Sequence, residues 1–156
     1  MENTNFVNCT GLPGQNHYTT ARDIAIMTRE LLKHEEILNY TNIWMDTLRG
    51  GEFGISNTNK LIRFYNGANG MKTGFTSSAL YCLSATAKRS DMQLIAATMK
   101  GSTSDKRFQD AKKLLDFGFA NYSVYKADID KLPDIKVKGG KKDFLKLKCE
   151  TSNILL

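Results

Sequence analysis

The sequence has few of the residues that build metal sites and disulfide frameworks. It contains three cysteines, Cys9, Cys82 and Cys149, and two histidines, His17 and His34. The cysteines are odd in number and far apart, so their spacing matches neither a zinc site nor a disulfide framework. We therefore predict no metal and no cofactor. Cys82 stands inside an apolar run and is expected to be a small buried hydrophobe.

Long apolar segments are also missing. No apolar run approaches the length that crosses a bilayer. Residues 1–5 lack the basic patch and following apolar stretch of a signal peptide, so we expect this chain to carry no signal peptide. We also expect no membrane anchor in it. With 156 residues, 41% hydrophobic and 24% charged, the composition is that of an ordinary globular protein with a real core.

Acidic residues are outnumbered, with 16 against 22 Lys and Arg, which gives a net charge of +6. The excess gathers between Lys126 and Lys148, where eight lysines accompany four aspartates. Two interpretations stay open: lysines that protect a solvated sheet edge, or attraction to an anionic cell envelope or membrane face. Nucleic acid is not expected as a partner, because the run lacks the regular interleaving of aromatic residues on which bases stack.

The patterns along the chain predict an α+β fold. Thr20 and Asp23 form a capping box at the start of a helix that runs to about residue 34. Its apolar residues recur at helical spacing and predict a face directed at the core: Ile24, Met27 and Leu31. Residues 43–49 are expected to form a short strand, residues 50–54 a turn and residues 67–70 a loop.

Three strands are predicted next, over residues 71–77, 80–87 and 92–99, and their short connections imply an antiparallel meander. A helix over 104–117 covers this sheet, and Gly118 is expected to stop it. The residues expected along its apolar face are Phe108, Ala111, Leu114 and Leu115.

The composition changes near residue 122. Residues 135–138 and 144–148 alternate as a β-hairpin beyond a boundary near residues 127–133, and an apolar ending at 154–156 resembles the start of a strand. We therefore predict two domains: residues 1–122, an antiparallel sheet covered by helices, and residues 123–156, the truncated start of a β-rich domain.

Lys72-Thr73-Gly74 opens the first strand of the meander, at its edge. A triplet this short is a weak signal by itself. Its chemistry, however, suits a peptide that ends in a carboxylate, because it offers a cation, a hydroxyl donor and a sheet edge without a side chain in the way.

Four segments occur in a recognisable order. They are Asn8-x-Thr10-Gly11-Leu12-Pro13, His17-x-Thr19-Thr20-Ala21-x-Asp23, Asn57-Thr58-Asn59-Lys60-Leu61 and Gly70-x-Lys72-Thr73-Gly74-Phe75-Thr76. With them the sequence resembles the serine-type D-alanyl-D-alanine carboxypeptidases among the low-molecular-mass penicillin-binding proteins, notably the Gram-positive sporulation-type members. The resemblance implies a partial β-lactamase/transpeptidase-like fold.

It also implies a serine acyl-enzyme mechanism built on Ser-x-x-Lys, Ser-x-Asn and Lys-Thr-Gly elements. In this scheme Lys72 is catalytic, Thr73 holds the substrate carboxylate and Gly74 leaves room for the peptide. The N–H of Phe75 is one oxyanion-hole donor, and Thr58 either lines the carboxylate end or belongs to a purely structural turn. The implied partners are peptidoglycan stem peptides ending in D-Ala-D-Ala and, for the intact family, β-lactams; the implied location is extracytoplasmic and membrane-associated.

The first two elements are not found in the expected places. Ser123-x-x-Lys126 follows Lys-Thr-Gly instead of preceding it, and Tyr40-x-Asn42 stands too near Lys72. We therefore expect a fragment that is inactive alone and lacks the N-terminal part that carries the nucleophile. Leu80, where the family usually has a small residue, is expected to affect packing only. The alternatives are a non-catalytic remnant that binds cell-wall peptide or a partner chain through the sheet edge, and a related β-lactamase or esterase.

Overall fold

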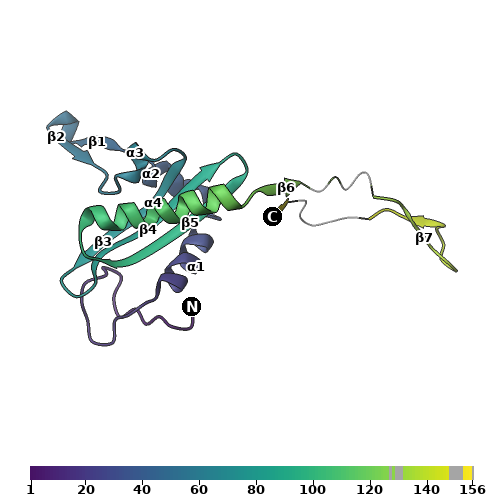
Figure 1. Cartoon of the computed structure of the whole chain (residues 1–156), viewed down its shortest axis with the longest axis horizontal. Coiled ribbons are helices and arrows are strands. Elements are labelled where there is room, and N and C mark those ends of the chain that lie inside the picture. The colour runs from purple at the N-terminus through teal and green to yellow at the C-terminus, as the bar shows by residue number, and fades with distance from the viewer. Residues whose placement is uncertain (127, 129–131, 148–152, 156) are drawn as a thin grey trace. The chain divides into compact units, whose positions relative to one another are not determined.

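The computed structural model describes residues 1–126, 128, 132–147 and 153–155 (Figure 1). It divides the chain into two compact units, Met1–Ala120 and Asn121–Leu156. The helices are α1 (Ala21–Leu31), η1 (Glu35–Ile37), α2 (Leu38–Thr41), η2 (Arg49–Gly51), α3 (Leu61–Phe64) and α4 (Ser104–Asn121). The strands are β1 (Met45–Leu48), β2 (Phe53–Ser56), β3 (Ala68–Thr76), β4 (Leu80–Arg89), β5 (Met92–Gly101), β6 (Val124–Lys126), β7 (Ile135–Lys136), β8 (Phe144–Leu145) and β9 (Asn153–Leu155).

The predicted meander is confirmed as an antiparallel sheet with the strand order β3-β4-β5. The strands are longer than predicted: the turn between β4 and β5 shrinks to two residues, and β3 already begins within the expected loop 67–70. This order places β3 at one edge, paired with β4 along its length. Figure 1 shows α4 running across this sheet, which confirms the α+β class.

Strand β4 is buried on both faces. Its odd-numbered residues Leu83, Ala85 and Ala87 join the hydrophobic core with side chains from α3, from the residue that follows α3 and from α4: Leu61, Tyr65, Phe108, Ala111 and Leu115. The alternate residues Ser84 and Thr86 are buried too and, because side chains alternate along a strand, they face the other way. The sheet thus has one apolar face under α4 and one hydroxyl-lined face.

Helix α1 packs on β4 and β5. Its predicted cap is confirmed, since the Thr20 side chain accepts a hydrogen bond from the backbone N–H of Asp23 at 3.1 Å. The prediction that Met27 and Leu31 face the core is wrong: both are about 40% exposed, at 40% and 39%. The helix turns Thr28 toward the sheet instead, because the Thr28 hydroxyl forms a hydrogen bond with the Ser84 hydroxyl on β4, with 2.7 Å between the two oxygens.

Helix α4 runs through Gly118 to Asn121, so the predicted stop is wrong. Gly118 is there because the helix approaches β5 closely: a Cβ at this position would lie 2.5 Å from Cδ1 of Leu94. Of the predicted apolar stripe, three residues are buried, but Leu114 is 52% exposed and lies at its border.

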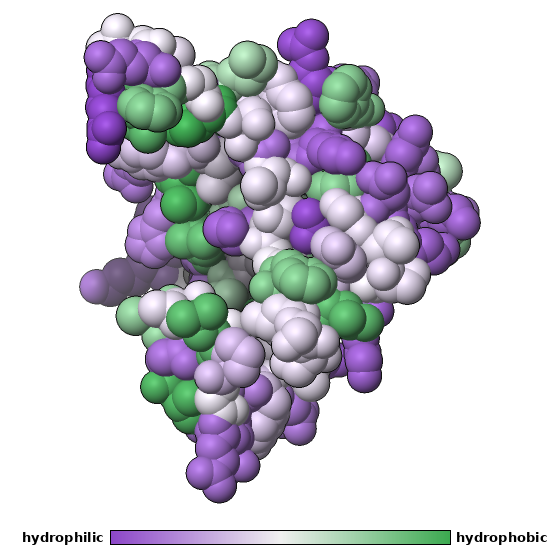
Figure 2. All heavy atoms as spheres, turned by 90° about the vertical axis from the view of Figure 1, so that its left-hand side faces the viewer, coloured by the Kyte–Doolittle hydropathy of each residue, from purple (hydrophilic) through white to green (hydrophobic). Residues whose placement is uncertain are grey.

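Strand β1 matches the expected strand at 43–49, but its partner β2 was not predicted. The two form a hairpin in which every residue is exposed. Beside its base, the rings of Trp44 and Phe64 meet edge-on, with 5.9 Å between their centroids. The side of the first unit that carries β1 and β2 faces the reader in Figure 2, where hydrophobic side chains lie in patches on the surface.

In the second unit, β7 pairs with β8 antiparallel, which confirms the predicted hairpin, and β6 pairs with β9. Most of the expected boundary at 127–133, together with Lys148 and Leu156, lies outside the described residues. The division at residues 122 and 123 into two domains stays a prediction. Within the part of the chain that the structure describes, no helix is long and apolar enough to cross a membrane.

Candidate functional site

Four of the five predicted site residues lie on strand β3, which forms one edge of the sheet, and the fifth, Thr58, lies in the turn before α3. Lys72, Gly74 and Phe75 are exposed there, and Thr73 is 8% exposed. In the described residues β3 pairs with β4 only, so the other side of its backbone has no strand partner there and is open to an extended peptide.

The structure brings Thr58 and Thr73 together. Their hydroxyl oxygens lie 2.6 Å apart, so one hydroxyl donates to the other. Each hydroxyl has one proton, and therefore one O–H of the pair remains available to an outside acceptor. An arrangement of this kind can donate to a carboxylate oxygen.

The turn that carries Thr58 is held by the two asparagines beside it. The Asn57 side-chain oxygen accepts from the N–H of Asn59 at 2.9 Å. The Asn59 side chain, only 1% exposed, donates to the Gly70 carbonyl at 2.9 Å and accepts from the N–H of Leu61 at 3.2 Å. Asn59 thus ties the turn directly to the strand that carries Lys72.

Lys72 and Thr73 belong to opposite faces of the sheet. Lys72 stands opposite Ser84 on the hydroxyl-lined face, and Thr73 stands opposite Leu83 on the face covered by α4. The Lys72 ammonium folds back along the strand and donates to the Thr73 carbonyl at 2.8 Å. The cation and the hydroxyl pair therefore flank the same short length of edge from two sides.

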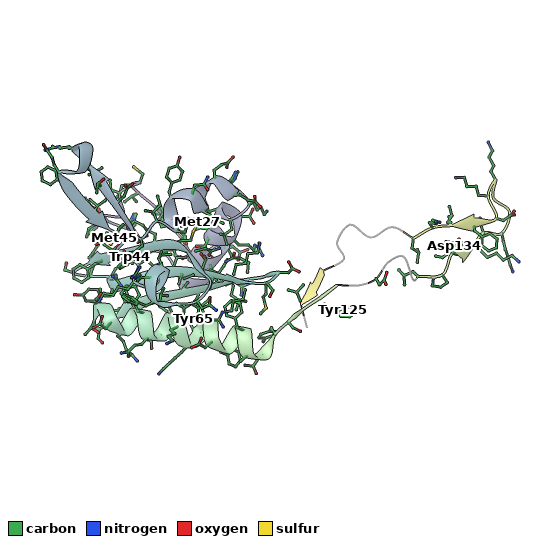
Figure 3. All side chains as sticks on the ribbon, turned by 90° about the horizontal axis from the view of Figure 1, so that it is seen from above. Met27, Trp44, Met45, Tyr65, Tyr125 and Asp134 are labelled. Carbon is green, nitrogen blue, oxygen red and sulfur yellow. The ribbon has the colours of Figure 1, made fainter. Side chains whose placement is uncertain are left out.

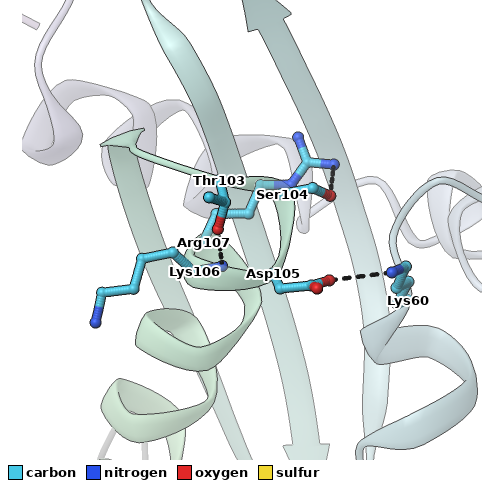
Figure 4. A network of polar contacts seen from close by, with 6 residues as sticks. All are labelled: Lys60, Thr103, Ser104, Asp105, Lys106 and Arg107. Atoms are coloured by element: carbon cyan, nitrogen blue, oxygen red, sulfur yellow. Dashed lines mark hydrogen bonds and ion pairs between the residues drawn. The ribbon is translucent and has the colours of Figure 1, made fainter.

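Arg107, on the first turn of α4, is a site residue that sequence analysis missed. Its side chain is buried and donates to the carbonyls of Gly74 and Cys82 at 3.2 and 3.3 Å. It also reaches the Ser104 hydroxyl at 3.4 Å, and Figure 4 shows this contact beside the ion pair of Lys60 with Asp105. One signal was present: Arg107 precedes the core residue Ala111 by one helical turn, so it had to face the sheet.

Arg107 brings a second cation to the edge strand. Its guanidinium lies over the rings of Tyr81 and Phe108, at 5.5 and 4.8 Å from their centroids. Desolvation by burial lowers the pKa of Arg107, yet an arginine starts so high that it stays charged at neutral pH. By binding one carbonyl on β3 and one on β4, it fixes the two strands against each other.

Other residues singled out from the sequence take local roles. Phe75 is 57% exposed and packs its ring against Tyr81, with 4.5 Å between centroids. His17 accepts a hydrogen bond from the N–H of Val7 at 3.1 Å, as expected of a residue that shapes a loop. Cys82 is half-buried, less than predicted. Ser123 is exposed and lies in the second unit, whereas Lys72 lies in the first.

Comparison with known proteins agrees with this fold. The family model described as D-alanyl-D-alanine carboxypeptidase, peptidase family S11, matches residues 1–103. The chain belongs to this family, a class that includes low-molecular-mass penicillin-binding proteins.

Individual relatives support the same assignment. D-alanyl-D-alanine carboxypeptidase DacF of Bacillus subtilis is 43% identical over 153 residues, which cover 94% of this chain and 39% of DacF. Penicillin-binding protein 5 from Haemophilus influenzae has a TM-score of 0.82 and 32% identity over 98% of this chain. Penicillin-binding protein D2 from Listeria monocytogenes, in its cefotaxime-bound form, has a TM-score of 0.69 and 34% identity over 74% of this chain.

The chain spans less than half the length of these proteins: 39% of DacF, 45% of the Haemophilus protein and 48% of the Listeria protein.

Proposed function

We propose that this chain supplies the substrate-binding edge of a serine-type D-Ala-D-Ala carboxypeptidase, which removes the terminal D-Ala from peptidoglycan stem peptides through an acyl-enzyme. The observation that carries the proposal is the Thr58–Thr73 hydroxyl pair on an edge strand, next to the exposed Lys72. The family membership and the cefotaxime-bound relative support a peptide or β-lactam as the ligand.

Each residue has a task in this scheme. A stem peptide adds to β3 as a further strand, and Gly74 leaves space for it. The free O–H of the Thr58–Thr73 pair donates to the terminal carboxylate of the peptide. Lys72 adds positive potential on the other side, and the N–H of Phe75 donates to the oxyanion that forms at the attacked carbonyl.

The serine nucleophile is not provided by these residues. Ser123-x-x-Lys126 follows β3 in sequence and Tyr40-x-Asn42 belongs to α2 and the residue after it, where the Thr41 hydroxyl is engaged with the Asn69 carbonyl at 2.8 Å. We propose that neither segment acts as a catalytic element, and that the nucleophile and the Ser-x-Asn serine come from chain outside these 156 residues.

A chimera tests the proposal. The segment of Bacillus subtilis DacF that matches this chain is replaced by the chain itself, and release of D-Ala from a D-Ala-D-Ala peptide is measured with covalent labelling by a fluorescent penicillin. We expect both activities in the chimera. We expect Lys72→Ala to lower kcat/KM by about 10²–10³-fold, and Thr58→Val or Thr73→Val by about 10–100-fold, chiefly through KM.

Lys88→Ala is the matched control, because Lys88 is another exposed lysine of the same sheet. A chimera that loses as much activity with Lys88→Ala as with Lys72→Ala would show that the sheet only needs charge, and the role given to Lys72 would be wrong.

The competing function is a non-catalytic remnant that binds cell-wall peptide through the free side of β3. The assignment of the nucleophile is tested with the 156-residue chain alone. We expect fluorescent penicillin to leave it unlabelled; a covalent adduct mapped to Ser123 would overturn our assignment of the nucleophile.

A further inference from the structure

The β7–β8 hairpin carries a concentrated positive charge that the proposed site does not use. Between Ile135 and Leu147 there are five lysines and one acid, Asp143. All five lysines are exposed: Lys136, Lys138, Lys141, Lys142 and Lys146. Three of them, at 138, 141 and 142, lie in the turn between the strands, around Gly139 and Gly140. The turn is therefore the most basic point of the described part of this unit.

The pairing of β7 with β8 sorts the side chains onto two faces. Ile135 stands opposite Leu145, and Lys136 stands opposite Phe144. Since neighbouring residues of a strand point to opposite faces, one face carries an aliphatic pair and the other a lysine beside an aromatic ring. The backbone pairing continues toward the turn, because the N–H of Val137 donates to the carbonyl of Asp143 at 2.8 Å.

Phe144 indicates which kind of anionic partner the basic face binds. Its side chain is 55% exposed, and it follows Lys142 and Asp143 directly at the end of the turn. A soluble polyanion without rings, such as polyphosphate, would need only the lysines. A ring among lysines suits a lipid surface, where aromatic side chains enter the headgroup region and lysines extend their ammonium groups to the phosphates.

We propose that the turn and basic face of the β7–β8 hairpin bind the surface of an anionic lipid bilayer. The lysines 138, 141 and 142 contact the phosphate groups, and Phe144 enters the interface beside them. This inference goes beyond the proposed carboxypeptidase site and does not depend on it, because no residue of β3 or of the 57–59 turn takes part.

The test measures binding of the whole 156-residue chain to vesicles by co-sedimentation. Vesicles of phosphatidylglycerol and phosphatidylcholine are compared with vesicles of phosphatidylcholine alone, at low and high salt. One lysine near an anionic surface contributes about fivefold in affinity. The triple variant Lys138→Gln/Lys141→Gln/Lys142→Gln should therefore bind the anionic vesicles on the order of a hundredfold more weakly, and raised salt should weaken the parent chain in the same direction.

The matched control removes three exposed lysines from the first unit: Lys88→Gln/Lys112→Gln/Lys113→Gln. It has the same net charge as the turn variant and should retain most of the binding. Phe144→Ser should reduce binding by about tenfold, since burial of a phenylalanine side chain contributes roughly that factor or more. Far-UV circular dichroism confirms that each variant keeps the parent's secondary structure.

Three results would overturn the proposal. The first is equal binding to neutral vesicles, which would assign the attraction to apolar surface alone. The second is an equal loss in the control variant, which would assign it to net charge. The third is full competition by soluble polyphosphate together with unchanged binding of Phe144→Ser, which would make the hairpin a polyanion site and not a membrane site.

Discussion

Asn59 is the residue on which the geometry of the candidate site depends most. Replacement by alanine leaves two groups without partners, the carbonyl of Gly70 and the N–H of Leu61, which now lie 2.9 and 3.2 Å from the side chain. Each buried group left unsatisfied costs about 1–3 kcal/mol. We therefore expect Asn59→Ala to lower the free energy of unfolding by about 2–6 kcal/mol, a large share of the 5–15 kcal/mol typical of a domain.

Urea unfolding of the 156-residue chain, followed by circular dichroism, measures this loss. Asn39→Ala is the control, because Asn39 is an exposed asparagine on α2 and should change stability by about 0.5 kcal/mol or less. Asn59→Asp adds a sharper test. An ionised carboxylate still accepts from Leu61 but cannot donate to Gly70, so the variant should gain stability relative to the parent as the pH falls and the carboxyl becomes protonated.

The reasoning is refuted if Asn59→Ala unfolds at the same urea concentration as the Asn39→Ala control. A pH-independent gap between Asn59→Asp and the parent would likewise show that the bond to Gly70 contributes nothing.

Three further predictions concern packing and titration. Thr28→Val and Ser84→Ala each leave one buried hydroxyl unpaired, so each should cost about 1–3 kcal/mol in chemical unfolding, and the double variant should cost less than the sum. Gly118→Ala should cost about 1–3 kcal/mol by crowding Leu94, although alanine favours helix, and Leu94→Ala should abolish that cost. Burial, with the hydrogen bond donated to a carboxylate on α4, raises the pKa of Tyr65 from 10.0 to about 12. The stability that the Tyr65 hydroxyl contributes is therefore fully present below pH 10 and is lost as the pH rises toward about 12. Between about pH 9 and about pH 11 the free energy of unfolding should therefore fall less in Tyr65→Phe than in the parent chain.

Each of these has a clear contrary result. Strictly additive losses in the Thr28 and Ser84 pair would show that the two hydroxyls do not depend on each other. An undiminished cost of Gly118→Ala in the Leu94→Ala background would place the strain elsewhere. A parent and a Tyr65→Phe variant that lose stability equally between the two pH values would exclude Tyr65 from the alkaline transition.

Features that follow from local rules could be predicted from the sequence. Thr20 caps α1 as expected, because an N-cap needs only the backbone three residues further on. The meander followed from strands joined by short turns, and the Lys72–Gly74 edge followed from its place as the first of them. The hairpin of the second unit followed from alternation around a pair of glycines.

Features that depend on a distant surface could not. Met27 and Leu31 follow a helical apolar pattern, yet α1 turns Thr28 inward because the strand it meets carries Ser84. Figure 3 shows Met27 among the side chains of the first unit. Glycine is a residue type that commonly ends a helix, and only the close contact with the Leu94 side chain explains why Gly118 lies inside α4. The role of Arg107 could not be predicted for a similar reason. Its partners are backbone carbonyls, which every residue has, so the sequence does not mark them.

The tie between the 57–59 turn and β3 also bears on how the chain folds. Asn59 meets Gly70 across 11 residues and Thr58 meets Thr73 across 15, whereas Thr28 reaches Ser84 across 56. Closing the shortest of these loops costs about 1.4 kcal/mol less entropy than closing the longest, by the logarithmic dependence on loop length. The hydroxyl pair and the edge strand therefore form a local unit, which can assemble before α1 docks on the sheet.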